Sequence, residues 1–302
     1  MVPVALFVYN RPFHLERVLD GLKENNIDLL YIFSDAPVTN NAADAGKVNT
    51  IRGIITKINW CRKEVFESSR HKGVDAAILE GISVVLAKHD KIIVLEDDCL
   101  PRPDFYNYMC QCLDYYEKEN KIACISAFLP PIGNETFRGY PYDVFFWQRF
   151  WSWGWGSWRR VWKDFNPDLE AALGKIKLAR INTTAFGRDV SLRNLGRLLE
   201  FQSVPWDAPF FLNMLLNNQF AVYPKESRIR NIGLDGSGAH CTAHNLTLDL
   251  KLGEVKEQKR LIFPASIREN PRICREILKL INFRPHNLNR RLLNAIRRLL
   301  WQ

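Results

Sequence analysis

Three consecutive carboxylates, Glu96, Asp97 and Asp98, follow an apolar run at 92–95 in this chain of 302 residues. The apolar run is typical of a buried strand, and a buried strand does not normally end in three negative charges. A hard divalent cation that also binds phosphate neutralises such a group. The alternative is a solvated turn. Taken alone, the three acids fit nucleotide-sugar, nucleotide or phosphatase chemistry equally well.

The elements that must position these acids alternate between strand and helix through the first 126 residues. Apolar runs predict strands at 4–8, 29–33, 61–66, 91–96 and 122–126. Helical spacing predicts helices at 12–22, 48–58, 74–85 and 103–118, with a polar loop at 40–46. This alternation predicts an α/β fold with a mostly parallel, Rossmann-like central sheet flanked by helices. Ligands of such sheets bind at the carboxyl ends of the strands, where the acids lie.

The alternation stops after residue 126. The stretch 145–162 is rich in aromatic residues, and helices are expected over 188–201 and 208–217, followed by a short strand at 220–223. A glycine-rich loop covers 231–244. Because no low-complexity linker separates the halves, we expect the second half to pack directly on the first.

Charge and cysteine usage bear on partners and compartment. The net charge is +9, and the segment 271–302 holds eight basic residues against one acid. Residues 286–302 fit a basic amphipathic helix, which either binds an anionic membrane surface or packs on the body. The rest of the chain is nearly neutral, which argues against nucleic acid as a partner. Seven scattered cysteines and the lack of a long apolar run predict a cytoplasmic protein with reduced thiols. If the basic helix binds a membrane, the protein would be peripheral on the inner face of that membrane.

The acids and their surroundings resemble a known family. The segment 95–98, followed by 100–105 with the sequence LPRPDF, resembles the DXD region of GT-A glycosyltransferases. The closest pattern is that of the Golgi N-acetylglucosaminyltransferase I family and its bacterial relatives. The similarity continues at 8–12, 126–127, 206–207 and 224–228, and so covers about residues 3–240. No anchor precedes Val4, which favours a soluble bacterial relative in glycan biosynthesis.

The resemblance implies a fold and a reaction. The fold would be of GT-A type, with a nucleotide-sugar-binding half at 1–126, an acceptor and catalytic half at 127–250, and a basic C-terminal helical tail at 251–302. The reaction would be metal-dependent transfer, with inversion, of a sugar from a UDP-sugar, UDP-GlcNAc being the first expectation. The acceptor would be a hydroxyl of a glycan or of a lipid-linked glycan.

The resemblance also assigns the metal and its surroundings. Asp98 would bind Mn2+ or Mg2+ directly. Glu96 and Asp97 would face the nucleotide or hold the waters of the metal. His240, in the late loop, would contact the metal or the diphosphate, although a surface histidine is the alternative.

Other residues would bind the nucleotide. Asp35 would accept the uracil N–H, and Asn10 and Arg11 would approach the nucleotide. Arg70 and Lys72 would reach the diphosphate. The alternatives are an ordinary turn acid for Asp35, a helix-start surface residue for Arg11, and solvated cations for the last two.

Asp207 is the candidate base, because displacement at the anomeric carbon needs a carboxylate to take the proton of the acceptor hydroxyl. Its position before an expected helix also fits an N-cap. Most of the aromatic stretch is expected to be core. Trp153 and Trp155 are the rings expected to touch substrate.

Two other functions stay open. A sugar-nucleotide nucleotidyltransferase shares this sheet architecture, but it is expected to open with a glycine-rich phosphate loop after the first strand, and 8–12 has no glycine. A non-catalytic scaffold at the membrane surface, with a GT-A-like fold, would bind no UDP in a metal-dependent way.

Overall fold

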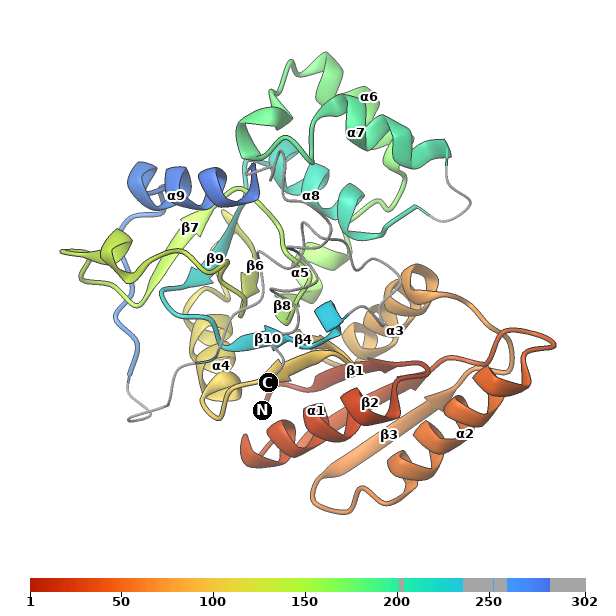
Figure 1. Cartoon of the computed structure of the whole chain (residues 1–302). Helices are drawn as coiled ribbons and strands as arrows, with labels where there is room; N and C mark the ends of the chain where they lie inside the picture. The colour runs from red at the N-terminus through yellow and green to blue at the C-terminus, as the bar shows by residue number, and fades with distance from the viewer. Residues whose placement is uncertain (201–203, 236–251, 253–259, 283–302) are drawn as a thin grey trace, which may run out of the picture.

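An eight-stranded sheet forms the centre of this computed structural model, which describes residues 1–200, 204–235, 252 and 260–282 (Figure 1). The strands lie in the order β3-β2-β1-β4-β8-β6-β9-β7. Their bounds are β1 (Val4–Val8), β2 (Leu29–Ser34), β3 (Arg62–Glu67), β4 (Lys91–Glu96), β6 (Ile122–Ser126), β7 (Val144–Trp147), β8 (Trp155–Trp158) and β9 (Phe220–Pro224). The short strands β5 (Cys99–Pro101) and β10 (Ile229–Asn231) pair antiparallel as a second sheet.

Strand direction confirms the predicted fold class. β1 pairs parallel with both β2 and β4, β2 with β3, and β6 with β9. β8 lies antiparallel between β4 and β6, and β7 is antiparallel to β9 at the edge. The protein is therefore an α/β protein with a mostly parallel sheet. β6 belongs to the first 126 residues yet pairs with two later strands, so both halves of the chain share one sheet.

Helices cover both faces of the sheet (Figure 1). The helices are α1 (Pro12–Glu24), α2 (Ala42–Thr56), α3 (Val74–Lys88), α4 (Phe105–Tyr115), α5 (Arg159–Trp162), α6 (Leu169–Leu178), α7 (Leu192–Arg197), α8 (Asp207–Leu216) and α9 (Pro271–Ile281). Short 3-10 turns are η1 (Asn134–Phe137), η2 (Thr183–Phe186), η3 (Leu198–Glu200) and η4 (Gly233–Asp235). None of the helices described here is long and apolar enough to cross a bilayer.

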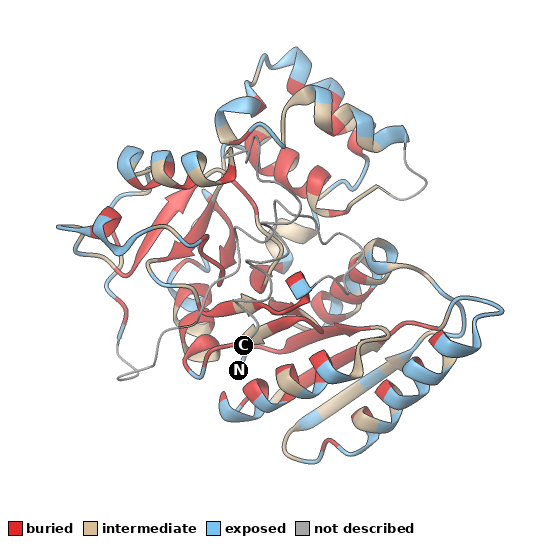
Figure 2. Ribbon diagram, viewed as in Figure 1, coloured by how far each residue is buried: buried red, intermediate tan, exposed pale blue. Residues whose placement is uncertain are grey.

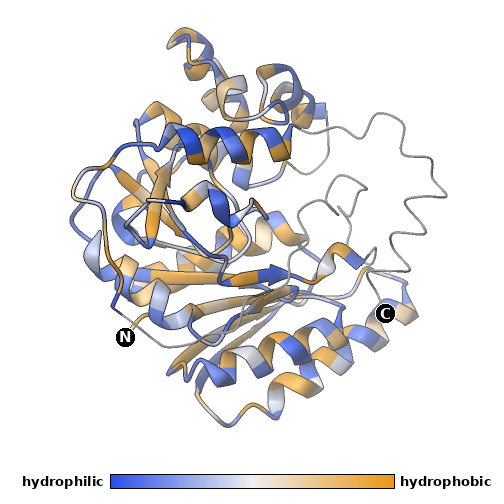
Figure 3. Ribbon diagram, turned by 60° about the vertical axis from the view of Figure 1, so that its left-hand side comes forward, coloured by the Kyte–Doolittle hydropathy of each residue, from blue (hydrophilic) through white to orange (hydrophobic). Residues whose placement is uncertain are grey.

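Alternation along β1 divides the core between the two faces. Ala5 and Phe7 pack with apolar residues of α3, α6, α8 and α9, whereas Leu6 and Val8 pack with those of α1, α2 and α4. Successive side chains of a strand point to opposite faces, which explains this division. Figure 2 shows the central strands buried between the helices and the edge strand β3 partly exposed, and Figure 3 shows hydrophobic residues concentrated on the strands.

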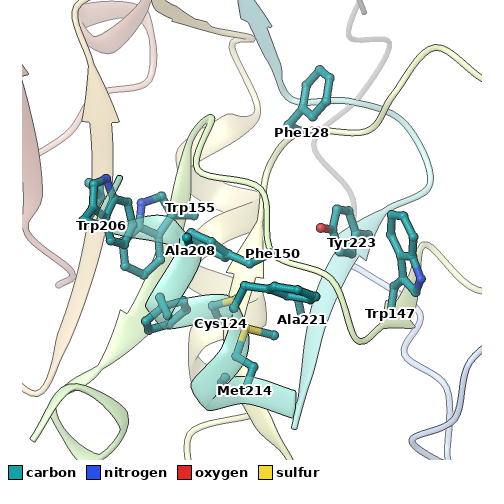
Figure 4. Close-up of a cluster of buried hydrophobic side chains, with 14 of the residues drawn as sticks. Cys124, Phe128, Trp147, Phe150, Trp155, Trp206, Ala208, Met214, Ala221 and Tyr223 are labelled. Carbon is teal, nitrogen blue, oxygen red and sulfur yellow. The ribbon is translucent and has the colours of Figure 1, made fainter. Parts of the chain in front are cut away.

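The aromatic stretch and the segment before α8 build the core of the second half (Figure 4). Trp155 stacks on Trp206 at a centroid distance of 5.2 Å, and Phe150 meets Trp155 edge-on at 5.1 Å. Trp147, Trp155 and Trp158 are almost completely buried. The expectation that most of these rings are core is thus confirmed.

Two helices differ from the sequence prediction. α2 begins within the expected loop because the Asn41 side chain accepts a hydrogen bond from the Asp44 amide and caps it. The helix expected over 188–201 is reduced to α7 and η3, and α7 begins only after Ser191, whose hydroxyl caps it. The capping residues therefore set the starts of α2 and α7, which differ from the starts that the sequence predicted.

The described part of the basic tail packs on the body. In α9, Ile273, Ile277 and Ile281 are buried. Arg272 Nη2 donates to the carbonyl of Glu135 at 2.7 Å. The expected amphipathic helix at 286–302 lies outside the described residues, as does His240.

Candidate functional site

The carboxyl ends of β1, β2 and β4 meet at one edge of the sheet. Val8 is level with Ser34 of β2, and Phe7 is level with Glu96 of β4. The segments that follow these strands therefore converge. The first turns of α3 and α8, together with η4, approach the same edge and complete the candidate site.

Arg11 binds two of the three acids at this edge. Its Nη2 lies 2.5 Å from Asp97 Oδ1, and its Nη1 lies 2.8 Å from Asp98 Oδ2. The Tyr9 amide donates a third hydrogen bond, to Asp97 Oδ2 at 3.1 Å. Arg11 immediately precedes α1, which starts at Pro12. Proline suits this position because its missing N–H is not needed in the first turn. The sequence prediction had Arg11 approach a nucleotide, whereas in this structure it pairs with Asp97 and Asp98.

Negative charge exceeds positive charge in this cluster. Burial, followed by the charges of Asp98 and Asp97, raises the pKa of Glu96 well above its ordinary value. Burial and then the Asp98 charge raise the pKa of Asp97 to about 6, although Arg11 acts in the opposite direction. One guanidinium thus does not offset three carboxylates, which favours either a proton on one of them or a further cation at this place.

η4 packs against the last acid. The Ile232 amide donates to the Asp98 carbonyl at 2.8 Å, and Asn231 Oδ1 accepts from the Gly233 amide at 2.8 Å. A Cβ built on Gly233 would overlap the Asp98 carboxylate and would lie 2.8 Å from Arg11 Nη1. Only glycine therefore fits at this position without moving the Arg11–Asp98 ion pair.

Asp35 organises the loop before α3. Its carboxylate accepts hydrogen bonds from the amides of Ala36 at 2.8 Å, Lys72 at 3.0 Å and Gly73 at 2.9 Å. His71 Nδ1 lies 3.0 Å from the same carboxylate. Gly73 has a φ of +79°, a conformation that glycine adopts without strain. Both oxygens of Asp35 are therefore engaged within the protein, so a hydrogen bond to uracil would have to share them.

Asn10 and Tyr9 hold a carboxylate that the sequence prediction missed. Asn10 Nδ2 donates to Asp44 Oδ1 at 2.6 Å, and the Tyr9 hydroxyl donates to Asp44 Oδ2. Burial opposes ionisation of Asp44, but these hydrogen bonds outweigh it and lower its pKa. The Tyr9 ring also lies 4.9 Å from the His71 ring. The Asn10 amide thus contacts Asp44 and positions the turn after β1.

A cavity of about 190 Å³ lies between the ends of β2 and β3 and the first turns of α3. Phe33, Phe66, Asp35 and Lys72 line it, together with Ser34, whose buried hydroxyl has no hydrogen-bond partner among the described residues. The Lys72 ammonium forms an ion pair with Glu80 at 2.6 Å. Arg70, by contrast, is exposed.

Asp207 is the first residue of α8. The residue before it, Trp206, occupies the N-cap position, and no side chain caps this helix. Instead the Trp206 amide donates to Asp75 Oδ1 of α3 at 3.0 Å. Asp207 is thus not the N-cap that the sequence left as its alternative.

Three charged groups surround Asp207. Burial and then the Asp75 charge raise the pKa of Asp207, whereas Arg149 acts in the opposite direction. The charge of Asp207 also contributes to the raised pKa of Glu96. Asp207 and the acids after β4 are therefore within electrostatic reach of each other, although 110 positions separate Asp207 from Asp97 in the printed sequence.

The two selected tryptophans occupy different environments. Trp153 is half-buried and meets the Phe128 ring at 4.7 Å. Trp155 has 0% of its surface exposed. Its ring lies in the core, supporting Trp206 and hence the start of α8, and has no face available to a substrate.

Several residues of the site carry no signal that sequence reasoning used. Tyr9, Asp44, His71, Asp75 and Arg149 all lie in turns or first helical turns. Only the fold shows what they contact. Within the described ranges, no group of three or more His, Cys, Asp or Glu side chains is arranged as a metal site.

Comparisons with known proteins complete the description. No model of a protein family matches the chain, and no curated protein sequence matches it. Among solved structures, it is similar to the mannosyltransferase PcManGT from Pyrobaculum calidifontis in complex with GDP-Man and Mn2+, with 12% identity and a TM-score of 0.42 over 71% of this chain and 68% of that one.

Two further solved structures are similar to this chain, one of a nucleotidyltransferase and one of a glycosyltransferase. A UDP-glucose pyrophosphorylase complexed with UDP-glucose has 10% identity and a TM-score of 0.42, covering 77% of this chain and 94% of that one. The galactosyltransferase LgtC, in complex with donor and acceptor sugar analogues, has 11% identity and a TM-score of 0.39, covering 74% and 73%. The similar structures thus include both glycosyltransferases and nucleotidyltransferases, and these weak likenesses do not choose between them.

Proposed function

We propose that this protein is a metal-dependent, inverting glycosyltransferase that uses a UDP-sugar, with UDP-GlcNAc as the first donor to test. The observation that carries this proposal is the electrostatic proximity of Asp207 to the acids after β4. The cluster of Glu96, Asp97 and Asp98 favours a cation. Asp207 is a separate desolvated carboxylate within electrostatic reach of that cluster. Direct displacement at an anomeric carbon needs these two functions.

The residues fit a divalent metal of the kind that Mg2+ and Mn2+ sites use. Mg2+ is usually bound through one or two carboxylates, with waters and substrate phosphates as the other ligands. Asp98 would supply the carboxylate, and the excess of negative charge around it favours a cation. Such a metal would neutralise the charge that develops on the leaving diphosphate. Arg11, which pairs with Asp98 in this structure, would contact the same phosphates.

The described residues would bind the donor in two parts. Asp35 and the cavity beside it support a nucleoside position at the ends of β2 and β3. Lys72 lines that cavity, and its ammonium, which pairs with Glu80 in this structure, would reach the diphosphate. Glu96 and Asp97, which precede Asp98 in the chain, would hold ribose hydroxyls or the waters of the metal.

Asp207 would act as the general base. It accepts the proton of the acceptor hydroxyl as the oxygen attacks the anomeric carbon and the bond to the diphosphate breaks. Its raised pKa suits this task, because a base works best when its pKa approaches the working pH. Asp75, the other carboxylate beside Asp207, is engaged by the Trp206 amide, which leaves Asp207 as the one proposed base, so a single displacement with inversion is the expected course.

The test is calorimetric titration with UDP, with and without Mn2+, on the unaltered protein and on Asp98→Ala. We expect Mn2+ to strengthen UDP binding by at least tenfold in the unaltered protein and to have no effect in the variant. Asp114→Ala, at an exposed carboxylate on α4, is the matched control and should behave like the unaltered protein. Equal UDP affinity under all conditions would refute the metal assignment.

A screen of UDP-sugars then identifies the reaction. Release of UDP from one donor, faster with a glycan acceptor, supports glycosyl transfer. Formation of a UDP-sugar and pyrophosphate from UTP and a sugar 1-phosphate would instead support a nucleotidyltransferase. Acceptors should include both free and lipid-linked glycans.

A further inference from the structure

A second cavity, of about 310 Å³, lies at the far end of α8 from Asp207. Two of its residues, Asn120 and Gln219, come shortly before β6 and β9. The cavity is therefore at the amino-terminal edge of the sheet, opposite the edge that carries Asp98. From Asp207 to Asn217 the chain advances ten positions, which corresponds to about 15 Å along a helix.

Side-chain amides with fixed orientation line this cavity. Asn213 Nδ2 donates to the carbonyls of Asn166 at 3.0 Å and Pro209 at 2.8 Å. Asn217 Nδ2 donates to the Asn213 carbonyl at 2.9 Å, and Gln219 Nε2 donates to the Asn120 carbonyl at 3.0 Å. A backbone carbonyl only accepts hydrogen bonds, so the nitrogen of each amide must face it.

These bonds do not use the amide oxygens, which can therefore accept hydrogen bonds from a ligand or, at the exposed Asn217, from water. Asn213, Asn217 and Gln219 each keep a side-chain carbonyl that accepts no hydrogen bond from the described residues. Each such oxygen has two lone pairs. The cavity thus offers several acceptors on three neighbouring side chains, which is a surface that suits a ligand with several hydroxyl donors.

The charges and rings of the cavity narrow the ligand further. Arg160 donates to the carbonyls of Tyr116, Glu117, Glu119 and Ile122, so its guanidinium is engaged by the backbone and is a weak anion site. Phe165 and Phe210, whose rings meet edge-on at 5.4 Å, supply an apolar wall. The exposed carboxylate of Asp164 also lines the cavity and only accepts hydrogen bonds, so a ligand that donates hydroxyls and presents an apolar C–H face matches these features.

We propose that this cavity is a saccharide-binding subsite, separate from the donor site, that holds a sugar residue of a glycan. Its assignment to the acceptor glycan rests on the proposed function, whereas saccharide binding itself does not. α8 connects the two sites, with Asp207 at its start and Asn213 on its last turns. A glycan that has one sugar residue bound in the cavity would thereby keep its other residues near the enzyme that modifies them.

Saturation-transfer NMR with methyl glycosides of N-acetylglucosamine, glucose, galactose and mannose, recorded without metal or nucleotide, tests the proposal. We expect at least one glycoside to bind the unaltered protein, and we expect saturating UDP with Mn2+ not to displace it. The double variant Asn217→Ala, Gln219→Ala should weaken its binding about tenfold, the loss expected for two neutral hydrogen bonds. Gln148→Ala, which removes a nearby amide outside the cavity, should leave binding unchanged.

Two further variants make the subsite testable independently of the donor site. Phe165→Ala removes part of the apolar wall and should also weaken saccharide binding. This variant keeps the test possible if the double variant does not fold. Asp98→Ala should keep saccharide binding even though it loses metal-dependent UDP binding, so that the two proposals fail independently. Absence of binding by every glycoside, or binding that survives both cavity variants in folded protein, would overturn the subsite.

Discussion

At the scale of single residues, the candidate site depends on a few carboxylates whose charges are unequally compensated. Asp97 and Asp98 share one guanidinium, whereas Glu96 is near Asp98, Asp97 and Asp207, which all raise its pKa. The three acids are consecutive in the sequence at the end of an apolar run, so the sequence alone predicts that they lie together at a strand end. Their shared partner Arg11 follows another strand, and the parallel pairing of β1 with β4 brings it there.

Asp207→Asn tests the proposed base. The variant removes the proton acceptor while keeping the size of the side chain, so kcat for glycosyl transfer should fall by about 10²–10⁴-fold. The affinity for UDP with Mn2+ should stay the same, because the proposed base would contact the acceptor and not the nucleotide. Asp168→Asn is the matched control, since an asparagine can still cap α6. Retained activity in Asp207→Asn would remove Asp207 as the base.

The dependence of kcat/KM on pH follows from the raised pKa of Asp207. The base acts in its ionised form, so activity should disappear as the pH falls through the raised pKa. This acidic limb should therefore lie above the ordinary value for an aspartate, 3.8. A pH–rate profile of the unaltered enzyme measures it. A limb at or below the ordinary value would contradict the burial-driven shift.

At the scale of elements, the first turn of α3 joins the two sides of the site. The amides of Lys72 and Gly73 bind Asp35 at the end of β2, and Asp75 binds the Trp206 amide before α8. The sequence prediction placed Lys72 near a diphosphate and assigned nothing to Asp75. Asp75 was missed because its partner lies 131 positions away along the chain.

Asp75→Asn separates the charge of this residue from its hydrogen bond. The charged groups that act on Asp207 or feel its charge are Asp75 on α3, Glu96 at the end of β4, and Arg149 after β7. Removing the Asp75 charge should lower the pKa of Asp207 and move the acidic limb of kcat/KM to lower pH. Asp75→Ala, which also removes the acceptor for the Trp206 amide, should in addition lower kcat. Identical pH profiles for the unaltered enzyme and Asp75→Asn would refute the electrostatic role.

Gly233→Ala tests how η4 positions the metal site. The added Cβ would overlap the Asp98 carboxylate, so the Arg11–Asp98 pair must move. We expect metal-dependent UDP binding to weaken at least tenfold in titrations. Gly46→Ala is the matched control, because nothing lies within 4 Å of its Cβ and α2 should gain about 0.5–1 kcal/mol. Unchanged UDP binding in Gly233→Ala would show that η4 does not constrain Asp98.

At the scale of the whole molecule, the site stands on an aromatic core that crosses from one half of the chain to the other. Trp155 of β8 stacks on Trp206, and Trp206 precedes Asp207. The sequence prediction gave Trp155 a contact with substrate, whereas its burial gives it a role in supporting α8. β8 itself lies between β4 and β6, so the second half of the chain is part of the sheet that carries the acids.

Trp155→Ala should destabilise the protein by roughly 3–5 kcal/mol, because it leaves a large cavity in a buried cluster. Urea unfolding followed by circular dichroism measures this loss. Trp162→Ala should cost clearly less, since Trp162 is only half-buried and its Nε1 bonds the hydroxyl of Ser83 near the surface. Equal losses for the two variants would contradict the assignment of Trp155 to the core.

The sequence by itself determined the order of strands and helices in the first half, the fold class, and the position of three acids at a strand end. These features depend on local periodicity and on neighbouring residues, which a chain displays directly. Tertiary structure alone decided which groups meet the acids, that Trp155 is core, and that Asp35 is engaged by the loop before α3. Pairings such as Arg11 with Asp98, 87 positions apart, arise from strand order and helix packing, and no local pattern encodes them.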